Sequence, residues 1–159
     1  MGLARRPALD LAAGEADTRK AIVANARSWI GTAYHHAADL KGVGVDCAML
    51  LIRVYGDLGL IEPADPRPYT RDWMLHRDDE RYLRWLLAYA PEVASPAPGD
   101  VILFRFGRCF SHGGIISAVA PLTIIHAFAP ARAVLEEEVG RNAELAERLN
   151  LARFASLWG

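Results

Sequence analysis

The feature that most constrains the fold is an aspartate and a cysteine followed by an apolar run, Asp46-Cys47-Ala48-Met49-Leu50-Leu51-Ile52. Aspartate is a preferred helix N-cap, because its side chain accepts a hydrogen bond from a backbone N–H of the first turn. We therefore expect a helix from Asp46 to about Leu58 that ends at Gly59. Because this helix is apolar nearly all round, it should be buried, with the Cys47 thiol in its first turn.

The rest of the chain divides into a helical part and a strand part. Apolar residues recur at helical spacing from Asp17 or Thr18 to about Ile30, and again from Asp78 to Tyr89. After a turn at 96–100, the pattern predicts strands at 101–106, 113–119, 122–128 and 133–139, a short helix at 142–149 and a last strand at 151–158. Helices that precede strands joined by short turns favour an α+β fold with an antiparallel sheet.

The length of 159 residues suits a single domain with one hydrophobic core. Residues 1–16 are expected to form a loose lead-in. Residues 61–90 contain Pro63, Pro66 and Pro68, and we interpret them as a surface insertion. They are not a linker between domains, because too little chain lies on either side to build two cores.

Composition excludes several functional classes. Hydrophobic residues make up 52% and charged residues 23%, which is typical of a globular protein. The net charge is −1 and no basic block is present, so neither nucleic acid nor an anionic membrane is an expected partner. No apolar run is long enough to span a membrane. The first 20 residues lack the apolar core of a signal peptide, so we expect synthesis in the cytoplasm without one.

The Cys47 thiol has two interpretations. Most free cysteines are small buried hydrophobes without chemistry. At a helix N-terminus, however, free backbone N–H groups and the helix dipole stabilise a thiolate, which lowers the thiol pKa and makes it nucleophilic. The second cysteine, Cys109, is expected to be structural. A disulfide between Cys47 and Cys109 is conceivable, but nothing in the sequence favours it.

A nucleophilic thiol needs a base and a group that orients the base. His112 and His126 fall on consecutive predicted strands, although each could be a structural histidine. If they lie opposite each other, their Cβ atoms are about 4.5–5.5 Å apart. His112 would then be the base, and His126 would fix its tautomer and ring orientation.

Other histidines compete for the role of base. His35 and His36 lie in the loop at 32–45, closer in sequence to Cys47. Adjacent side chains point to different sides, so at most one of these two should face the site. His76 lies in the insertion, and we assign it no catalytic role.

Zinc is the alternative use of such residues. Cys109 and His112 are three residues apart, and Cys47 and His126 could complete a ligand set. The paired ligand spacings of structural zinc sites are absent, so we predict neither a metal nor another cofactor.

Five short motifs appear in a fixed order along the chain: Gly31-Thr32-Ala33-Tyr34, Val45-Asp46-Cys47, 98–104 (Pro-Gly-Asp-Val-Ile-Leu-Phe), 111–116 (Ser-His-Gly-Gly-Ile-Ile) and Ile125-His126-Ala127. This set resembles the NlpC-type cell-wall cysteine peptidases. The resemblance covers roughly residues 18–130. It implies a compact papain-like fold in which the cysteine helix packs on an antiparallel sheet.

The resemblance also implies roles for single residues. Cys47 matches the nucleophile, with its backbone N–H in the oxyanion hole, His112 matches the base, and His126 matches the third polar residue of a Cys-His-His triad. Tyr34 matches a tyrosine that contacts the substrate or the oxyanion region. Asp46, His35 and His36 are further candidates for substrate binding or oxyanion support. Many members have Ser and Gly after the cysteine, whereas Ala48 and Met49 stand here, so their substrate contacts cannot be transferred.

The activity implied is endopeptidase cleavage of peptidoglycan stem peptides next to γ-D-glutamyl and diaminopimelate. Within the insertion, Pro68-Tyr69, Asp72-Trp73, Leu75-His76-Arg77 and 80–83 look like the branch encoded with tail proteins of phages and gene transfer agents. That branch implies tail proteins as partners and delivery by the particle or by lysis. The alternatives are a non-catalytic tail-assembly component, and an amidase or acyltransferase that uses the same Cys–His pair.

Overall fold

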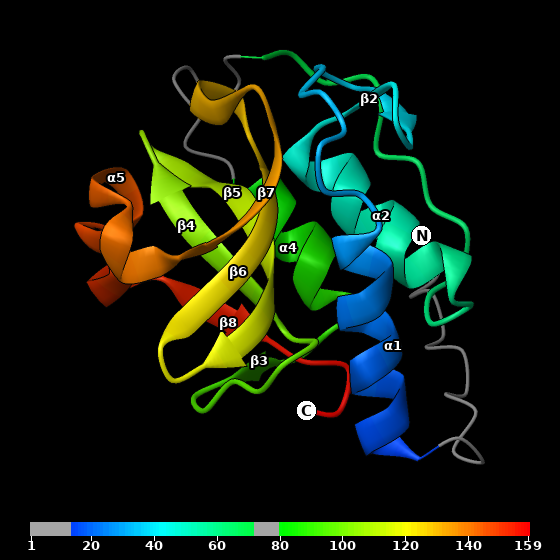
Figure 1. Cartoon of the computed structure of the whole chain (residues 1–159), viewed down its shortest axis with the longest axis vertical. Helices are drawn as coiled ribbons and strands as arrows, with labels where there is room; N and C mark the ends of the chain where they lie inside the picture. The colour runs from blue at the N-terminus through cyan, green and yellow to red at the C-terminus, as the bar shows by residue number, and fades with distance from the viewer. Residues whose placement is uncertain (1–13, 72–79) are drawn as a thin grey trace.

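The computed structural model describes residues 14–71 and 80–159 (Figure 1). The helices are α1 (Glu15–Arg27), α2 (Cys47–Asp57), α4 (Arg81–Leu87) and α5 (Ala143–Ala146), with the 3-10 turns η2 (Ala129–Ala131), η3 (Val139–Arg141) and η4 (Leu149–Leu151). The strands are β1 (Asp39–Leu40), β2 (Gly44–Val45), β3 (Glu92–Val93), β4 (Val101–Phe106), β5 (Cys109–Val119), β6 (Leu122–Phe128), β7 (Ala133–Glu138) and β8 (Arg153–Ala155).

The main sheet has the strand order β3-β8-β4-β5-β6-β7, and all its neighbouring strands run antiparallel. The hairpin of β1 and β2 stands apart from it. Helices α1 and α2 come first in the chain and the long strands follow, so the predicted α+β class with an antiparallel sheet is confirmed.

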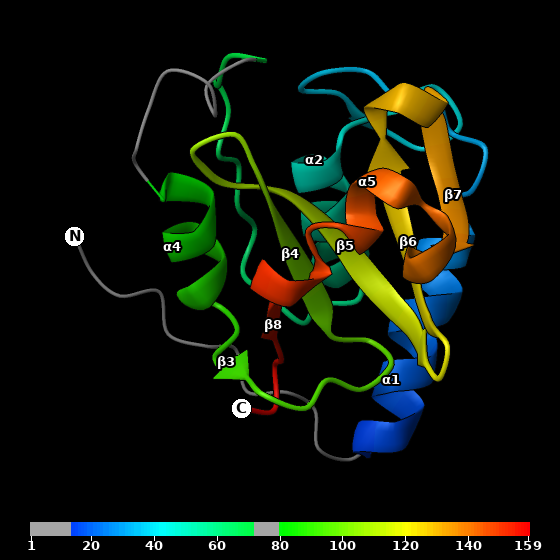
Figure 2. The ribbon, with the colours of Figure 1, turned by 90° about the vertical axis from the view of Figure 1, so that its left-hand side faces the viewer.

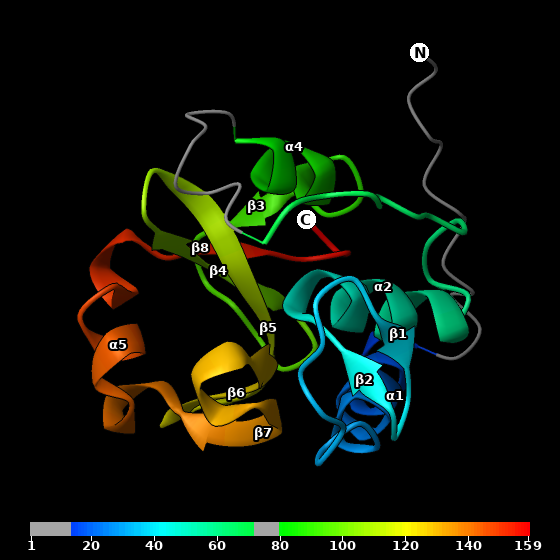
Figure 3. The same cartoon turned by 90° about the horizontal axis from the view of Figure 1, so that it is seen from above.

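The sheet separates two hydrophobic clusters. On one face, α1, α2 and α4 pack on inward residues of the strands such as Val101, Ile115 and Ile125. On the other face, α5 and η3 cover a smaller cluster that contains Phe104 and Phe128. Figure 3 shows α5 across the sheet from α1 and α2, and Figure 2 views the molecule from the side of α5. Covering on both faces explains why β5 is buried at nearly every position from 109 to 116.

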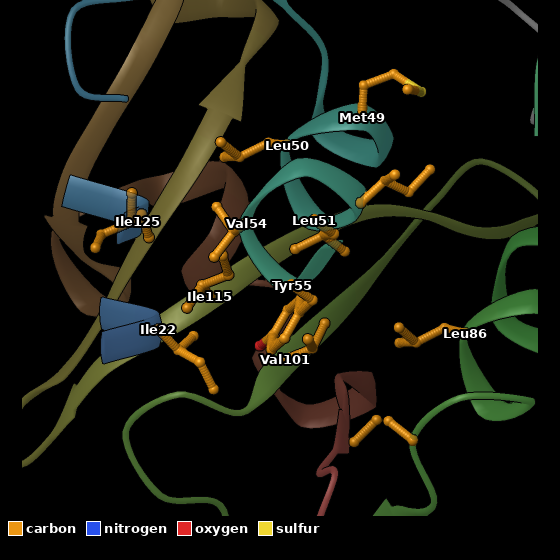
Figure 4. Close-up of a cluster of buried hydrophobic side chains, with 14 of the residues drawn as sticks. Ile22, Met49, Leu50, Leu51, Val54, Tyr55, Leu86, Val101, Ile115 and Ile125 are labelled. Atoms are coloured by element: carbon orange, nitrogen blue, oxygen red, sulfur yellow. The ribbon is translucent and has the colours of Figure 1, made fainter. Parts of the chain in front are cut away.

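Helix α2 is the centre of the larger cluster. Its residues from Met49 to Ile52, together with Val54 and Tyr55, are buried. Figure 4 shows Val54 beside Ile115 of β5 and Tyr55 beside Val101 of β4. Burying each large apolar side chain contributes about 1.5–3 kcal/mol. This burial fixes the helix, and therefore its first residue, Cys47, against the sheet. The stop at Gly59 is also confirmed, with φ +69° just after the C-cap.

Two helix predictions need correction. Helix α1 begins at Glu15, so the loose lead-in to residue 16 was drawn too long, and the N-cap is Gly14 instead of Asp17 or Thr18. The carbonyl of Gly14 accepts from both the N–H and the hydroxyl of Thr18. The helix ends at Arg27, and Ile30 beyond it is 46% exposed instead of facing the core. Local capping alternatives within one turn cannot be separated by periodicity alone.

Other differences concern the strands and the insertion. The second long strand begins at Cys109 and not at 113, so His112 lies inside β5. The predicted loop at 32–45 contains the β1–β2 hairpin. The predicted helix start at Asp78, the insertion residues 72–79 and His76 lie outside the described residues. Helix α4 turns Tyr82 toward the core, while Leu87 is only half-buried.

Candidate active site

Cys47 is the first residue of α2, as predicted. The Asp46 side chain caps the helix, since its Oδ1 accepts from the Met49 N–H at 2.9 Å. Val45, before the cap, is fully buried and pairs with Asp39 in the hairpin. Capping on one side and the hairpin on the other fix the backbone at residue 47. The thiol is partly exposed and faces a cavity.

The thiol lies against the part of β5 that is not paired with β6. The β5–β6 ladder starts only at Ile115↔Ile125, so residues 111–113 have no partner on β6. The Cys47 Sγ donates to the Ser111 carbonyl at 3.7 Å, and the Gly113 N–H points toward the sulfur. The nucleophile candidate therefore sits beside the backbone on both sides of His112.

The thiol pKa departs from the sequence prediction. We expected the helix N-terminus to lower it, whereas burial and the nearby Asp46 carboxylate raise the pKa of Cys47 to about 12. The N–H groups of Gly113, Ala48 and Cys47 act in the opposite direction but do not prevail. The residue that caps the helix thus places a negative charge beside the thiol. The resting nucleophile is a neutral thiol and needs a base to remove its proton.

His112 and His126 are brought together as the sequence predicted. Their facing nitrogens, His112 Nε2 and His126 Nδ1, are 2.7 Å apart. The pairing is diagonal and not directly opposite, because the register places His126 level with Gly114. A methyl group at position 114 would lie 3.2 Å from the His126 Cβ, so glycine there lets the ring of His126 lean toward His112.

A carboxylate that the sequence prediction missed completes this chain of contacts. Glu137 Oε1, on β7, lies 2.8 Å from His126 Nε2 and also accepts from Asn142 Nδ2 at 2.9 Å. An ionised carboxylate only accepts hydrogen bonds, so His126 carries its proton on Nε2 and accepts at Nδ1. His112 must then donate from Nε2, which leaves its Nδ1 free of a proton. Glu137 thereby sets both tautomers and leaves His112 ready to act as a base.

The histidine pair lies in a dry, aromatic environment. The rings of Phe104, Phe106 and Phe128 surround His112, with centroids 5.5–6.2 Å from its own. Burial and the neighbouring His126 hold the pKa of His112 well below its usual range, and burial lowers the pKa of His126 to about 4. Both imidazoles are therefore neutral at pH 7, as a proton acceptor requires.

The resting structure does not join the two halves of the site. Among the described residues, the thiol hydrogen bonds to Ser111 and not to His112. Catalytic contacts are commonly looser before substrate binds.

The cavity beside the thiol has a volume of about 550 Å³. Its wall is made by the start of α2, by the segment 61–71 and by α4, and it includes the aromatic side chains of Tyr69, Trp85 and Tyr89. Tyr34 also lines the cavity. His36 also lines it, whereas the exposed ring of His35 packs on Gly44 outside it. The prediction that at most one of the two faces the site agrees with this arrangement.

The second oxygen of Asp46 anchors the cavity wall. Asp46 is only 2% exposed, and its Oδ2 accepts from the Ala37 N–H and from the Tyr69 hydroxyl, each at 2.7 Å. His36 Nε2 donates to the Tyr69 carbonyl at 2.7 Å. The loop before the cysteine and the segment 61–71 are thus tied to the cap of the nucleophile helix. In this structure Asp46 and His36 support the wall through these contacts.

Further features bear on the alternatives. Neither Cys47 nor Cys109 is in a disulfide, and Cys109 is fully buried. Within residues 14–71 and 80–159, no three His, Cys, Asp or Glu side chains are grouped as they would be to hold a metal ion. Over the same residues, no helix has the length and apolar character needed to cross a membrane.

Comparison with known proteins gives matches in structure but not in sequence. No protein-family model matches the chain, and no curated protein matches it. The NlpC/p60 domain of the peptidoglycan hydrolase SagA is 22% identical with a TM-score of 0.54, over 87% of this chain and 97% of that one.

Two larger proteins share the same architecture. The peptidoglycan hydrolase RipB from Mycobacterium tuberculosis is 18% identical with a TM-score of 0.57, and NlpC1 from Trichomonas vaginalis is 15% identical with the same TM-score. The chain spans 64% of RipB and 41% of NlpC1. At such identities the likeness concerns the fold, which for this chain is the papain-like fold of NlpC/p60 domains.

Proposed function

We propose that the protein is a cysteine endopeptidase that hydrolyses peptide bonds of the peptidoglycan stem. The observation that carries this proposal is a thiol at a helix N-terminus that contacts the backbone of Ser111, the residue before a histidine that is paired with His126 in a fixed tautomer. The likeness in fold to the NlpC/p60 domain of a peptidoglycan hydrolase supports the choice of substrate class. The bond next to γ-D-glutamyl and diaminopimelate is proposed from the sequence resemblance.

In the proposed reaction, His112 Nδ1 takes the thiol proton while Cys47 Sγ attacks the carbonyl carbon. The anion on the carbonyl oxygen is stabilised by backbone N–H groups, among them that of Cys47, with Tyr34 at the same cavity. The carbon–nitrogen bond then breaks, and His112 returns the proton to the leaving amine. Water attacks the thioester with His112 again as base, which releases the acid and restores the thiol.

Glu137 and His126 are proposed as positioning residues in this cycle. When His112 gains a proton, the hydrogen bond from its Nε2 to His126 holds the imidazolium in place, and the carboxylate of Glu137 stabilises the positive charge through His126. A buried charge without such a partner would be costly. These roles account for the hydrogen-bonded chain His112–His126–Glu137, which would be unusual if the three residues only packed in the core.

The cavity suits an anionic, extended ligand. Arg71 and Arg81 line it together with the aromatic wall, and stem peptides carry free carboxylates that a guanidinium binds well. Ala48 and Met49 provide no polar side chain in the first turn, and Met49 is buried. We therefore propose that substrate contacts come from segment 61–71, His36 and α4 instead.

The deciding experiment is digestion of purified peptidoglycan followed by mass spectrometry of the released fragments. Wild type should release peptides cut within the stem, and Cys47→Ala should release none while keeping its fold by circular dichroism. Cleavage between sugar and peptide would indicate an amidase, and transfer to an added amine would indicate an acyltransferase. A well-folded wild type that yields no products would favour the non-catalytic alternative.

The finer origin in phages or gene transfer agents is also part of the proposal. It is supported by the insertion motifs, of which Pro68-Tyr69 and 80–83 are described, and Tyr69 contacts Asp46. In that case tail proteins would be the partners, and the particle or lysis would carry the enzyme to the cell wall. Mass spectrometry of particles purified from the host tests this: absence of the protein from them contradicts it.

A further inference from the structure

The hydroxyl of Tyr82 is a buried polar group without a partner. Tyr82 lies on α4 with 7% of its surface exposed, and its ring stacks on Trp85 with centroids 6.2 Å apart. In the described part of the chain its oxygen has no hydrogen bond. Leaving a buried hydroxyl unsatisfied destabilises a fold, so such groups call for an explanation.

The position of this hydroxyl points to the reaction centre. Tyr82 lines the same cavity as Cys47. A methyl group at position 113 would lie 2.7 Å from the Tyr82 oxygen, so a side chain at this position would displace the hydroxyl from where it lies. The N–H of the same residue, Gly113, points at the Cys47 sulfur. The hydroxyl and the thiol therefore flank one peptide unit of β5.

The charges around the hydroxyl favour its acting as a donor. Burial, together with the nearby Cys47 and Asp46, raises the pKa of Tyr82 well above its usual value. The phenol therefore keeps its proton at any physiological pH. A neutral O–H in a desolvated site next to the nucleophile is suited to an oxygen that gains negative charge during attack.

We propose that the Tyr82 hydroxyl belongs to the substrate site, where it donates a hydrogen bond to the carbonyl oxygen of the acyl group that Cys47 attacks. Bound substrate then satisfies the group that is unpaired in the free protein. This inference rests on the proposed thiol nucleophile, but it is independent of whether the acyl group comes from peptidoglycan. It also gives helix α4 a part in the chemistry.

The first test compares activity with stability in Tyr82→Phe. We expect kcat/KM for stem-peptide cleavage to fall about a hundredfold, which is the lower range for removing one oxyanion donor. The melting temperature should stay equal or rise, because an unsatisfied hydroxyl has been removed. A purely structural Tyr82 would give wild-type kcat/KM, and that result overturns the proposal.

Tyr55→Phe is the matched control. Tyr55 is also a buried tyrosine, but its hydroxyl donates to the Gly99 carbonyl at 2.7 Å, and it does not line the cavity that contains Cys47. The control should lower the melting temperature and leave kcat/KM unchanged. Tyr82→Phe should therefore lose activity without losing stability, and Tyr55→Phe should lose stability without losing activity.

A second measurement does not depend on the natural substrate. N-Acetylglycinal adds to a thiol: the sulfur bonds to the aldehyde carbon, and the thiol proton ends on the former carbonyl oxygen. Its affinity can be measured by how far it protects Cys47 from iodoacetamide. Tyr82→Phe should bind the aldehyde about tenfold more weakly, while its alkylation rate without aldehyde stays at that of wild type.

The two measurements separate the failure of each proposal. Weaker aldehyde binding in Tyr82→Phe, with no peptidoglycan cleavage by wild type, supports the role of Tyr82 and contradicts the substrate. Equal aldehyde binding by wild type and Tyr82→Phe contradicts the role of Tyr82, whatever the wild type cleaves. A Cys47 that forms no adduct with either reagent contradicts both proposals.

Discussion

The two sides of the Cys47 thiol are built in opposite ways. On the histidine side, His112, His126 and Glu137 form a continuous chain of hydrogen bonds within an aromatic shell. On the cavity side, aromatic side chains and charged side chains of both signs surround open space, and the Tyr82 hydroxyl has no hydrogen-bond partner among the described residues. We interpret the side chains whose hydrogen bonds are complete before substrate binds as parts of the proposed catalytic machinery. We interpret a polar group without a hydrogen-bond partner as a contact for the ligand. Damage to the histidine side should lower kcat, and damage to the cavity wall should alter substrate binding; the Tyr82 hydroxyl, which we propose donates to the reacting carbonyl oxygen, is the exception on the cavity side.

The largest effect is expected from His112→Ala. Without the base, kcat for stem-peptide cleavage should fall by about 10⁴-fold or more, as it does when one member of a catalytic set is removed. The alkylation rate of Cys47 by iodoacetamide at pH 9 should change by less than about twofold, because in the free protein the thiol hydrogen-bonds to the Ser111 carbonyl and not to His112. A kcat within tenfold of wild type would show that another group is the base.

Acid should destabilise the histidine side through His126. Its pKa is lowered to about 4 in the folded protein, so between pH 6.5 and 4 the unfolded chain binds a proton that the folded chain does not. The free energy of unfolding should therefore decrease as the pH falls through this range, by about 2–3 kcal/mol from this group alone. Urea unfolding at several pH values measures it.

In His126→Asn that part of the pH dependence of the free energy of unfolding should disappear. An unchanged slope in His126→Asn would mean that the buried imidazole does not resist protonation in the folded state.

Glu137→Gln should have a smaller effect on the same side. The amide can donate as well as accept, so it no longer enforces one tautomer on His126. We expect kcat to fall about tenfold, a fraction of what a positioned acid–base group contributes. The ¹⁵N chemical shifts of His126 should show a mixture of tautomers in place of one.

Glu136→Gln on the same strand is the control, since Glu136 pairs with Arg27 near the surface. It should leave both kcat and the histidine shifts as in wild type. If the His126 shifts in Glu137→Gln also stay as in wild type, Glu137 does not set the tautomer.

The smallest effect is expected on the cavity side, from Tyr69→Phe. The variant loses the hydrogen bond to Asp46, and with it part of the anchorage of segment 61–71. We expect KM to rise about threefold with kcat nearly unchanged, which corresponds to less than 1 kcal/mol of binding. Steady-state kinetics on a stem peptide measure both. A loss of kcat as large as that of Glu137→Gln would show that the two sides are not separable.

Local signals in the sequence were sufficient for the centre of the site. The cap at Asp46, the thiol at position 47 and the strand at 122–128 each follow from a few neighbouring residues. The pairing of His112 with His126 followed from two adjacent strands joined by a short turn. Such features depend on contacts close in sequence, which is why they could be predicted.

Features that depend on distant contacts were missed. Glu137 stands in the run Glu136-Glu137-Glu138, which looks like a solvated edge, and only the register of β6 and β7 brings it to His126. Side chains alternate between the two faces of a strand, so the sequence does indicate that Glu137 points to the opposite face from Glu136 and Glu138. The thiol pKa was predicted in the wrong direction: the helix N–H groups alone would lower it, whereas burial and the charge of the capping Asp46 raise it.

The two oxygens of Asp46 have a consequence for protein engineering. One holds the first turn of the nucleophile helix, and the other holds Tyr69 of the cavity wall. A segment transplanted from a related enzyme in place of residues 61–71 would bring new substrate contacts, but unless it also brought a hydroxyl for Asp46 it would leave that buried carboxylate short of a donor. The wall segment therefore cannot be exchanged independently of the nucleophile helix. Mutant libraries that vary the cavity wall should keep tyrosine at position 69.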